Sequence, residues 1–271
     1  MIKADSPQLD IILPTVVDTG RFLIEEEFLY SPIEPAHTPL LIAKAAWNGL
    51  LPMGAGEGHN VVLLKIHRRR TVLSPGDVHV GRQSRKLAAR FQLTIDTAFL
   101  EVVKGIQAHT FTDTPGDNWL TDDLASMYLA ANELSQQTGV TFHSVELWDK
   151  ASGRLAAGEI GYTVGEIYSS CTGFALKEAF PGSGTLQLAA LGKWLRCCGF
   201  TLWDLGMGLK YKFELGGQEE PREAWVAHVR QLRGLSVQLR SPAASQSTKE
   251  LLASGPKEAQ PPDDEPDRIT S

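Results

Sequence analysis

The sequence predicts an α+β fold in which a mixed, largely antiparallel sheet is flanked by helices. Residues 140–148 alternate apolar and polar side chains, as a strand with one buried face does, and residues 154–162 repeat the pattern after a turn. A third such run covers residues 166–174. A helical pattern at 185–198 and a short apolar strand at 200–205 follow. Three strands, a helix and a further strand in this order indicate one α+β core.

Helices are expected before this core. Residues 38–49 have helical spacing, with Pro39 in the first turn and Gly49 as a stop. Further helices are expected at 96–106 and at 121–138, and the second of these opens with a threonine that can cap it, followed by two acids. The chain is therefore expected to bring helices to the sheet from its N-terminal half.

Composition changes along the 271 residues and predicts three regions. We expect a small N-terminal α/β region at 1–95, which holds the basic patch described below, and the α+β core at 96–234. Residues 235–271 are rich in Ser, Pro, Gln and acids, with too little apolar content to offset the entropy of ordering. We predict that this tail is disordered.

The cellular setting is predicted from what the sequence lacks. The apolar runs are too short for a membrane-spanning helix, and two acids near the N-terminus are atypical of a targeting peptide. The three cysteines have no metal-ligand spacing, and an odd, sparse count suits a reducing compartment. We expect a cytoplasmic monomer without a bound metal or membrane contact.

Charge is distributed unevenly in this acidic chain, whose net charge is −6. Eight Lys and Arg residues lie between positions 65 and 90, opposed by Asp77 alone. Such a patch can neutralise phosphates of a nucleic acid, although a solvated charged surface is the alternative. The phosphate-binding candidates in this stretch are Arg68, Arg69, Arg70, Arg82, Arg85 and Lys86.

Six segments, in chain order, carry a family resemblance. The most specific is 143–148, which reads His-Ser-Val-Glu-Leu-Trp. Together the segments resemble the motifs of leucyl/phenylalanyl-tRNA–protein transferases, over about residues 40 to 230. The other segments are 47–53 (Trp-Asn-Gly-Leu-Leu-Pro-Met), 118–121 (Asn-Trp-Leu-Thr), 157–161 (with Gly158 and Gly161), 202–206 (Leu-Trp-Asp-Leu-Gly) and 215–217 (Leu-Gly-Gly) followed by Arg222.

The resemblance implies an N-acyltransferase (GNAT-like) core and an aminoacyltransferase activity. Members of the family move an amino acid from aminoacyl-tRNA, which acts as co-substrate without a further cofactor, to the N-terminal amine of a protein, a step of N-degron protein catabolism. The partners it implies are therefore aminoacyl-tRNA and a protein or peptide N-terminus. The basic residues above, with Lys210 and Lys212, would bind the tRNA.

The resemblance also implies the site residues. Asp204 would be catalytic, because a carboxylate at a strand end can orient the attacking amine and accept charge. The family's glutamine two residues further on is Gly206 in this chain, which leaves the proton relay at this site open. An aspartate that caps the strand-end turn is the alternative role for Asp204. The substrate-binding candidates are Trp47, Trp119, Glu146, Glu159, Tyr168 and Cys171.

Two other functions remain open. Gly182 and Gly184, just before the helix at 185–198, could cradle the pyrophosphate of an acyl-CoA at the helix start. Ala179 stands where acetyl-CoA-dependent N-acyltransferases carry a basic or amide residue, which disfavours this reading. A non-catalytic descendant that binds tRNA or peptides is the third possibility, since Gly206 replaces the family's glutamine.

Overall fold

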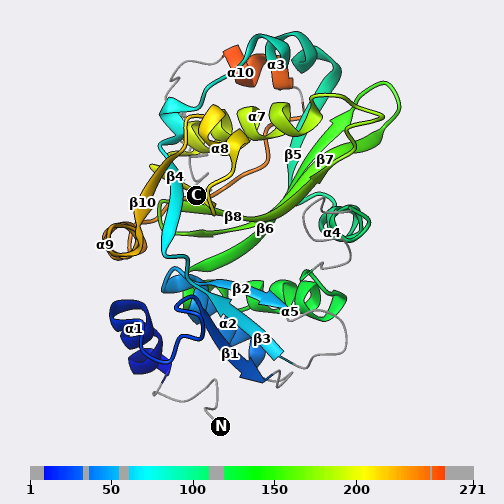
Figure 1. Ribbon diagram of the computed structural model, residues 1–271. Coiled ribbons are helices and arrows are strands. Elements are labelled where there is room, and N and C mark those ends of the chain that lie inside the picture. The colour runs from blue at the N-terminus through cyan, green and yellow to red at the C-terminus, as the bar shows by residue number, and fades with distance from the viewer. Residues whose placement is uncertain (1–8, 33–36, 55–60, 110–118, 245, 254–271) are drawn as a thin grey trace, which may run out of the picture.

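The computed structural model describes residues 9–32, 37–54, 61–109, 119–244 and 246–253. Its centre is a seven-stranded sheet with the order β10-β4-β9-β8-β7-β6-β5 (Figure 1). Strands β8 and β9 pair in parallel, and the other neighbouring pairs are antiparallel. The strands are β4 (Arg69–Leu73), β5 (Phe91–Ile95), β6 (Val140–Asp149), β7 (Arg154–Val164), β8 (Ile167–Ala175), β9 (Leu202–Gly206) and β10 (Gln218–Pro221).

The predicted fold class is confirmed at this level. The sheet is largely antiparallel, and helices flank it. Strands β6, β7 and β8 lie within two residues of the expected ranges. Their boundaries could be predicted because successive side chains of a strand point to opposite faces of the sheet and give an alternating sequence pattern. Strand β10 was not expected, since its residues Gln-Glu-Glu-Pro lack the β-branched and aromatic types that favour strands.

A smaller sheet lies beneath the large one in Figure 1, with the order β1-β3-β2. Helices α1 and α2 pack beside it. Strands β4 and β5 come from the predicted N-terminal region yet pair in the seven-stranded sheet, so the predicted boundary after residue 95 runs through that sheet. The elements of this part are α1 (Leu9–Thr19), β1 (Phe28–Pro32), α2 (Thr38–Trp47), β2 (Leu51–Gly54) and β3 (Val61–Lys65).

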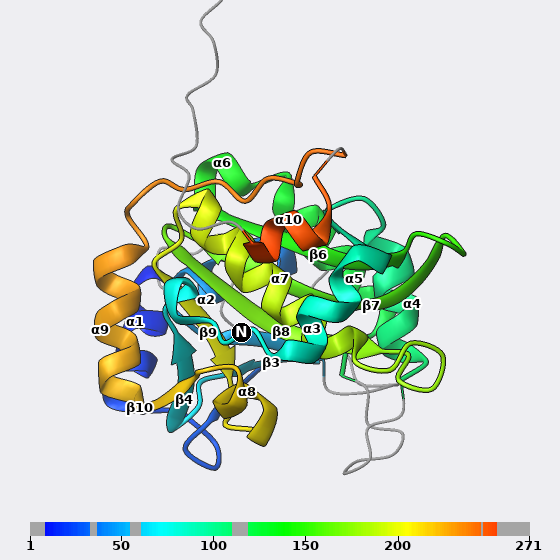
Figure 2. The same cartoon turned by 90° about the horizontal axis from the view of Figure 1, so that it is seen from above.

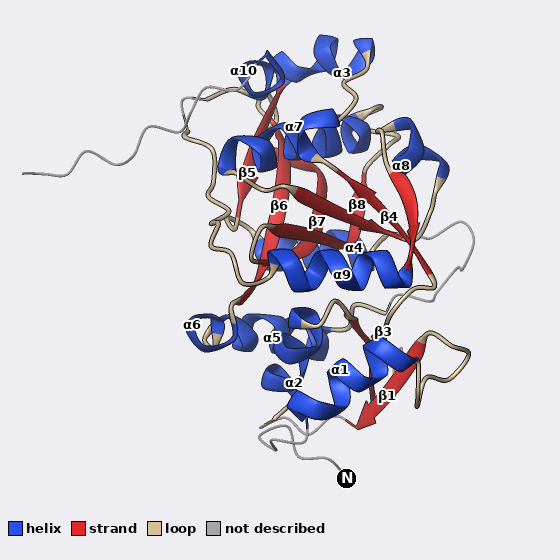
Figure 3. Cartoon of the chain, turned by 90° about the vertical axis from the view of Figure 1, so that its left-hand side faces the viewer, coloured by secondary structure: helices blue, strands red, loops and turns tan. Residues whose placement is uncertain are grey.

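Helices cover both faces of the large sheet. Helix α7 crosses one face, with α3 and α10 beside it (Figure 2), and α4 and α5 pack on the other. Helix α9 runs along the sheet edge formed by β4 and β10 and contacts α1 (Figure 3). The helices not yet bounded are α3 (Arg82–Leu87), α4 (Phe99–Gln107), α5 (Asp122–Asn132), α6 (Ser135–Thr138), α7 (Ser183–Cys198), α8 (Lys210–Glu214), α9 (Arg222–Leu232), α10 (Thr248–Ala253) and the 3₁₀ turns Pro75–Asp77 and Ala88–Arg90.

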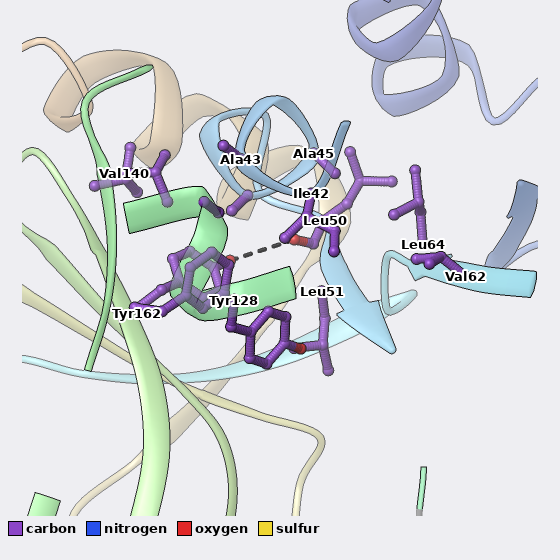
Figure 4. Packing of buried hydrophobic residues seen from close by; sticks show 14 of the residues in the cluster. Ile42, Ala43, Ala45, Leu50, Leu51, Val62, Leu64, Tyr128, Val140 and Tyr162 are labelled. Carbon is purple, nitrogen blue, oxygen red and sulfur yellow. Dashed lines mark hydrogen bonds between the residues drawn. The ribbon is translucent and has the colours of Figure 1, made fainter. Parts of the chain in front are cut away.

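The sheet separates two hydrophobic cores. The first joins the large sheet to α2, α4, α5, α9 and the small sheet, and the second lies under α7. In the first core the rings of Tyr128 and Phe142 stack 4.2 Å apart, and the Tyr162 hydroxyl donates to the Leu50 carbonyl at 3.4 Å (Figure 4). Buried aromatic hydroxyls need such partners. The hydrogen bond from Tyr162 therefore ties the connection between α2 and β2 to the large sheet.

Part of the segment predicted as a disordered tail is folded. Helix α10 buries Leu251 and Leu252 against α7 and β5, and Leu239 joins the same core. These leucines supply the apolar contact that the overall composition of the segment seemed to lack. The remainder of the predicted tail, 254–271, lies outside the described residues, as does Asn118 of the 118–121 motif. Over the ranges described, the structure has no helix that combines the length and apolar character needed to cross a membrane.

Candidate active site

A buried ion pair joins β4 to β9 at the centre of the candidate site. Arg70 donates from Nε to Asp204 Oδ1 at 2.8 Å and from Nη2 to Oδ2 at 2.5 Å. A bulge between Thr71 and Val72 shifts the register of β4 on β9 beside this pair. Burial lowers the pKa of Arg70, but the Asp204 carboxylate outweighs this effect and the pKa lies above its usual value. The two hydrogen bonds form a bidentate ion pair, in which each side chain fixes the orientation of the other.

Both oxygens of the Asp204 carboxylate accept hydrogen bonds. Its side chain is 0% exposed, and Oδ1 also accepts the backbone N–H of Gly206 at 2.8 Å. This contact is the turn-capping role that was the alternative for Asp204. On the other side of the pair, the Arg70 guanidinium lies over the Trp225 ring at 4.6 Å. Asp204 therefore acts on the strand end through Arg70 and the turn at Gly206.

Two of the expected pocket residues meet on the face of the sheet under α7. The carboxylate of Glu159 accepts hydrogen bonds from Tyr168 Oη (2.8 Å), Ser170 Oγ (2.8 Å) and Gln187 Nε2 of α7 (3.1 Å). Burial raises the pKa of Glu159, and the three donors oppose that shift. Tyr168 is 0% exposed, so its ring is a core residue. Glu159 is 4% exposed and therefore does not face solvent.

Asp204 lies on the opposite face from this group. Its neighbours Trp203 and Leu205 belong to the core under α7, and side chains alternate along a strand. Cys171 of β8 packs against the other core, on the same side as Asp204. Burial, followed by the charges of Asp204 and Glu159, raises the pKa of the Cys171 thiol well above its usual range. The structure thus divides the four residues between two faces of one sheet.

Glu146 has a structural environment. It is 0% exposed, and its oxygens accept hydrogen bonds from the hydroxyls of Ser144 (2.6 Å), Thr94 (2.6 Å) and Thr97 (2.9 Å). The backbone N–H groups of Thr97 and Ala98, at the start of α4, also donate to it, at 3.3 and 3.2 Å. A carboxylate at a helix N-terminus satisfies otherwise unpaired donors. Glu146 therefore fixes the connection between β5 and α4.

The two tryptophans predicted to bind substrate lie among the helices and the small sheet. Trp47, at the end of α2, lies under the guanidinium of Arg233 at 5.2 Å. It lines a surface pocket of about 400 Å³ with residues that include Asp10 and Lys44. Trp119 is half-buried against the first core, and its carbonyl accepts the N–H of Gly54 at 3.0 Å. Neither of these contacts involves the Arg70–Asp204 pair.

Helix α3 covers the glycine turn that could have held an acyl-CoA. Gly182 has φ +84° at the start of α7, and a Cβ placed on it would lie 3.0 Å from Leu87 Cδ1 and 3.1 Å from Gln83 Nε2. The Ser183 hydroxyl donates to the Ala156 carbonyl at 3.2 Å. Leu87 and Gln83 of α3 therefore cover the Gly182 side of the turn, whereas Pro181 and Thr185 are exposed.

Comparison with known proteins decides the family. The family model described as leucyl/phenylalanyl-tRNA protein transferase matches residues 72–230, more than half of the chain. The chain belongs to this family. The match spans β5 to β9 and contains Asp204, Glu159, Tyr168 and Cys171. The resemblance predicted from the sequence motifs is thereby confirmed, and the protein is an aminoacyltransferase of this family.

Curated relatives agree with the family model. A leucyl/phenylalanyl-tRNA–protein transferase of Dinoroseobacter shibae is 25% identical over 230 residues, covering 84% of this chain and 96% of the relative. One from a Jannaschia species is 30% identical over 203 residues, covering 74% and 88%. Among solved structures, L-PGS from Bacillus licheniformis matches with a TM-score of 0.41 at 10% identity, covering 61% of this chain and 65% of its own. The chain is thus a divergent member of the transferase family.

The predicted tRNA-binding cations of this family member are paired with an acid, buried, or exposed without an ion pair among the described residues. Arg68 and Arg69 pair with Glu26 (3.2 Å) and Glu219 (2.8 Å), and Arg70 is buried, so it has no surface for a phosphate. Lys210 is exposed and pairs with Glu214 at 3.8 Å. The α3 cations are exposed and form no ion pair with any acid in the described part of the chain; they are Arg82, Arg85 and Lys86.

Lys212 points inward, unlike Lys210. Its Nζ donates to the carbonyls of Leu205 and, at 3.0 Å, of Met207, at the end of β9. Burial lowers the pKa of Lys212 to about 8; Asp204 and Glu159 oppose this shift and Arg70 adds to it. Lys212 is therefore a neighbour of the Arg70–Asp204 pair.

His67 is a site residue that sequence reasoning missed. It lies next to the arginine run and is 6% exposed. Burial, with the charges of Arg70, Lys65, Lys212 and Arg222, lowers its pKa to about 2, so the imidazole is neutral at physiological pH. A single histidine beside three arginines matches no motif. The only hint in the sequence was the position of His67 next to Arg68–Arg70, of which Arg70 turns inward.

Proposed function

We propose that the protein transfers the aminoacyl group of an aminoacyl-tRNA to the N-terminal amine of a protein, as a step of N-degron protein catabolism. The observation that carries this proposal is the family match over residues 72–230, which includes the strand of Asp204 and its neighbours β7 and β8. In this proposal the aminoacyl-tRNA is the co-substrate, no further cofactor takes part, and the enzyme acts as a monomer in the cytoplasm.

Within this proposal Asp204 positions the site. Its carboxylate holds the Arg70 guanidinium and the turn at Gly206, where the strand ends. The attacking amine would be oriented at this strand end, whose turn at Gly206 the buried pair fixes.

We also propose that the seven-stranded sheet is a GNAT-like N-acyltransferase core. The meander β6–β8, the crossing helix α7 and the parallel pairing of β9 beside β8 support this. The acyl-CoA alternative is disfavoured, because Gln83 and Leu87 of α3 occupy the space beside Gly182 that a pyrophosphate would need. Ala179, at the position of the usual basic or amide residue, points the same way.

A transfer assay tests the proposal. Purified protein is incubated with radiolabelled aminoacyl-tRNAs, one amino acid at a time, and with an acceptor that begins with Arg or Lys. We expect label on the acceptor N-terminus with at least one charged tRNA. Turnover with acetyl-CoA and none with any charged tRNA would favour the acyl-CoA alternative instead. Binding of charged tRNA without any transfer would favour the non-catalytic descendant.

A further inference from the structure

Lys212 occupies a defined place at the end of β9. It belongs to α8, but its side chain turns back so that Nζ donates to the carbonyls of Leu205 and Met207. These two carbonyls flank Gly206, the residue whose N–H is held by Asp204. A neutral amine has two N–H donors and one lone pair. With both donors engaged by the two carbonyls, the lone pair is directed away from the strand.

Gly206 leaves room beside this amine. A Cβ placed on Gly206 would lie 3.9 Å from Lys212 Nζ and 4.0 Å from His67 Nε2. The residue has φ +74°, a conformation that favours glycine. No side chain of Gly206 therefore separates the two nitrogens from each other at this point. Lys212 Nζ and His67 Nε2 thus border the same space beside the turn.

Burial keeps part of Lys212 neutral. Burial is the main cause that lowers its pKa to about 8, and Arg70 of β4 adds to it, whereas Asp204 of β9 and Glu159 of β7 oppose it. The Tyr211 ring of α8 lies 5.7 Å from Nζ, and His67 stays neutral beside it. At pH 8 about half of the Lys212 side chains are free amines.

The other candidates for a base are less suited. Asp204 has both oxygens engaged and no exposed surface. His67 has its pKa held at about 2, so it is a very weak base at neutral pH. Lys212 keeps a partly exposed side chain beside Met207 and Tyr211, which are each about half exposed. In the proposed reaction an acceptor peptide would approach from that side.

We propose that Lys212 is the general base of the transfer reaction, with its neutral Nζ accepting a proton from the attacking α-amine. This inference rests on the proposed function. The α-amine nitrogen bonds to the ester carbonyl carbon, and its surplus proton passes to Nζ. The bond from that carbon to the 3′-oxygen of the tRNA then breaks, and the lysine ammonium returns the proton to that oxygen. The products are an amide and a free 3′-hydroxyl, and Lys212 is regenerated.

The first test compares variants in the transfer assay at subsaturating acceptor, from pH 6 to pH 10. Lys212→Arg keeps the cation but cannot act as a base, and Lys212→Met removes both. We expect each to lose roughly 100-fold or more in rate, the usual scale for a lost general base. Lys104→Met, at an exposed lysine of α4, is the matched control and is expected to stay within about twofold of the parent.

The pH profile separates Lys212 from the acceptor. An acceptor α-amine itself titrates at about pH 7.7 to 8.0, so below that range the parent needs two deprotonated groups. We therefore expect the logarithm of the parent rate to rise with pH at a slope of about two, and that of Lys212→Arg at a slope of about one. A purely structural lysine would leave the slope unchanged.

Direct labelling of the parent protein supplies a readout that needs no activity or variant. Lysines are modified with acetic anhydride at a series of pH values, and the peptide that carries Lys212 is quantified by mass spectrometry. We expect its labelling midpoint at about pH 8. A midpoint at or above pH 10, the ordinary range of a lysine, overturns the inference.

The outcomes are distinguishable from failure of the proposed function. Transfer by the parent together with a Lys212→Arg variant that stays within threefold, or with an unchanged slope, overturns the role of Lys212 alone. Absence of transfer by the parent with every charged tRNA overturns the proposed function and this inference with it. Thermal unfolding of each variant identifies a folding loss, in which case the labelling midpoint of the parent decides.

Discussion

Arg70 and Asp204 are each other's only charged partner inside the sheet among the contacts of the described residues, and both are essentially unexposed. Replacing Asp204 by Ala would leave the guanidinium buried without its counter-charge. Such a loss typically costs about 3 to 5 kcal/mol in the free energy of unfolding. We expect Asp204→Ala to show a destabilisation of that size by chemical denaturation, together with loss of transfer.

The control for this prediction removes both charges. In the double variant Arg70→Met with Asp204→Leu, apolar side chains replace the pair, and most of the lost stability is expected to return. Transfer should stay lost, because the strand end is no longer held by the carboxylate. A destabilisation of less than about 1 kcal/mol for Asp204→Ala would show that the buried pair relaxes and that its loss is compensated.

At this scale the sequence predicted the strands on which residues lie, but not the contacts of their side chains. The sequence pattern placed Glu159 and Tyr168 on neighbouring strands. The hydrogen bond between them, however, depends on the register shift between β7 and β8 at Ile160 and Gly161. Lys210 and Lys212 are two residues apart and were assigned one role. Lys210 is exposed, whereas Lys212 turns inward and donates to the Leu205 carbonyl of β9.

At the scale of elements, α3 presents the unpaired part of the basic stretch. Arg82, Arg85 and Lys86 are exposed, whereas Arg68 and Arg69 have acidic partners. We expect the triple variant with Gln at 82, 85 and 86 to lower the slope of log K against log salt for tRNA by about two. Each phosphate contact contributes about 0.7 to 0.9 to that slope.

The matched variant has Gln at 68 and 69, where the cations are neutralised by Glu26 and Glu219. Its salt slope is expected to change by less than about one. Titration of labelled tRNA at several salt concentrations measures both variants. Equal slopes for the parent and the α3 variant would mean that this helix is a solvated charged surface and that the tRNA binds elsewhere.

Elements with strong periodicity could be predicted, and those held by pairing could not. The alternation of β6 to β8 and the helical spacing of α7 gave ranges within two residues of the structure. Strand β10 is a strand because β4 pairs with it and Arg69 binds Glu219 across the two strands. Residues 121–138 form α5 and α6 with a break between them, where one helix was expected.

At the scale of the whole molecule, the seven-stranded sheet needs a cover on both faces. The first core is closed by α2, α4, α5 and α9, which the chain supplies from both of its halves. The second core has α7 as its main cover, and Val237, Leu239, Leu251 and Leu252 complete it from the C-terminal segment. Composition alone hid this contribution, because these few apolar residues are spread through a polar stretch.

Truncation separates the packed part of that segment from the rest. Ending the chain at residue 234 exposes the core that Leu251 and Leu252 cover, and each buried leucine contributes about 1.5 to 3 kcal/mol. Part of this loss is offset, because the chain no longer loses the entropy of ordering the segment. We expect this truncation to lower the free energy of unfolding by a net amount of at least about 2 kcal/mol. Ending the chain at residue 253 keeps α10 and serves as the control, with an unfolding midpoint close to that of the full chain. If both truncations unfold like the full chain, α10 adds no net stability, and α7 alone is a sufficient cover for the sheet.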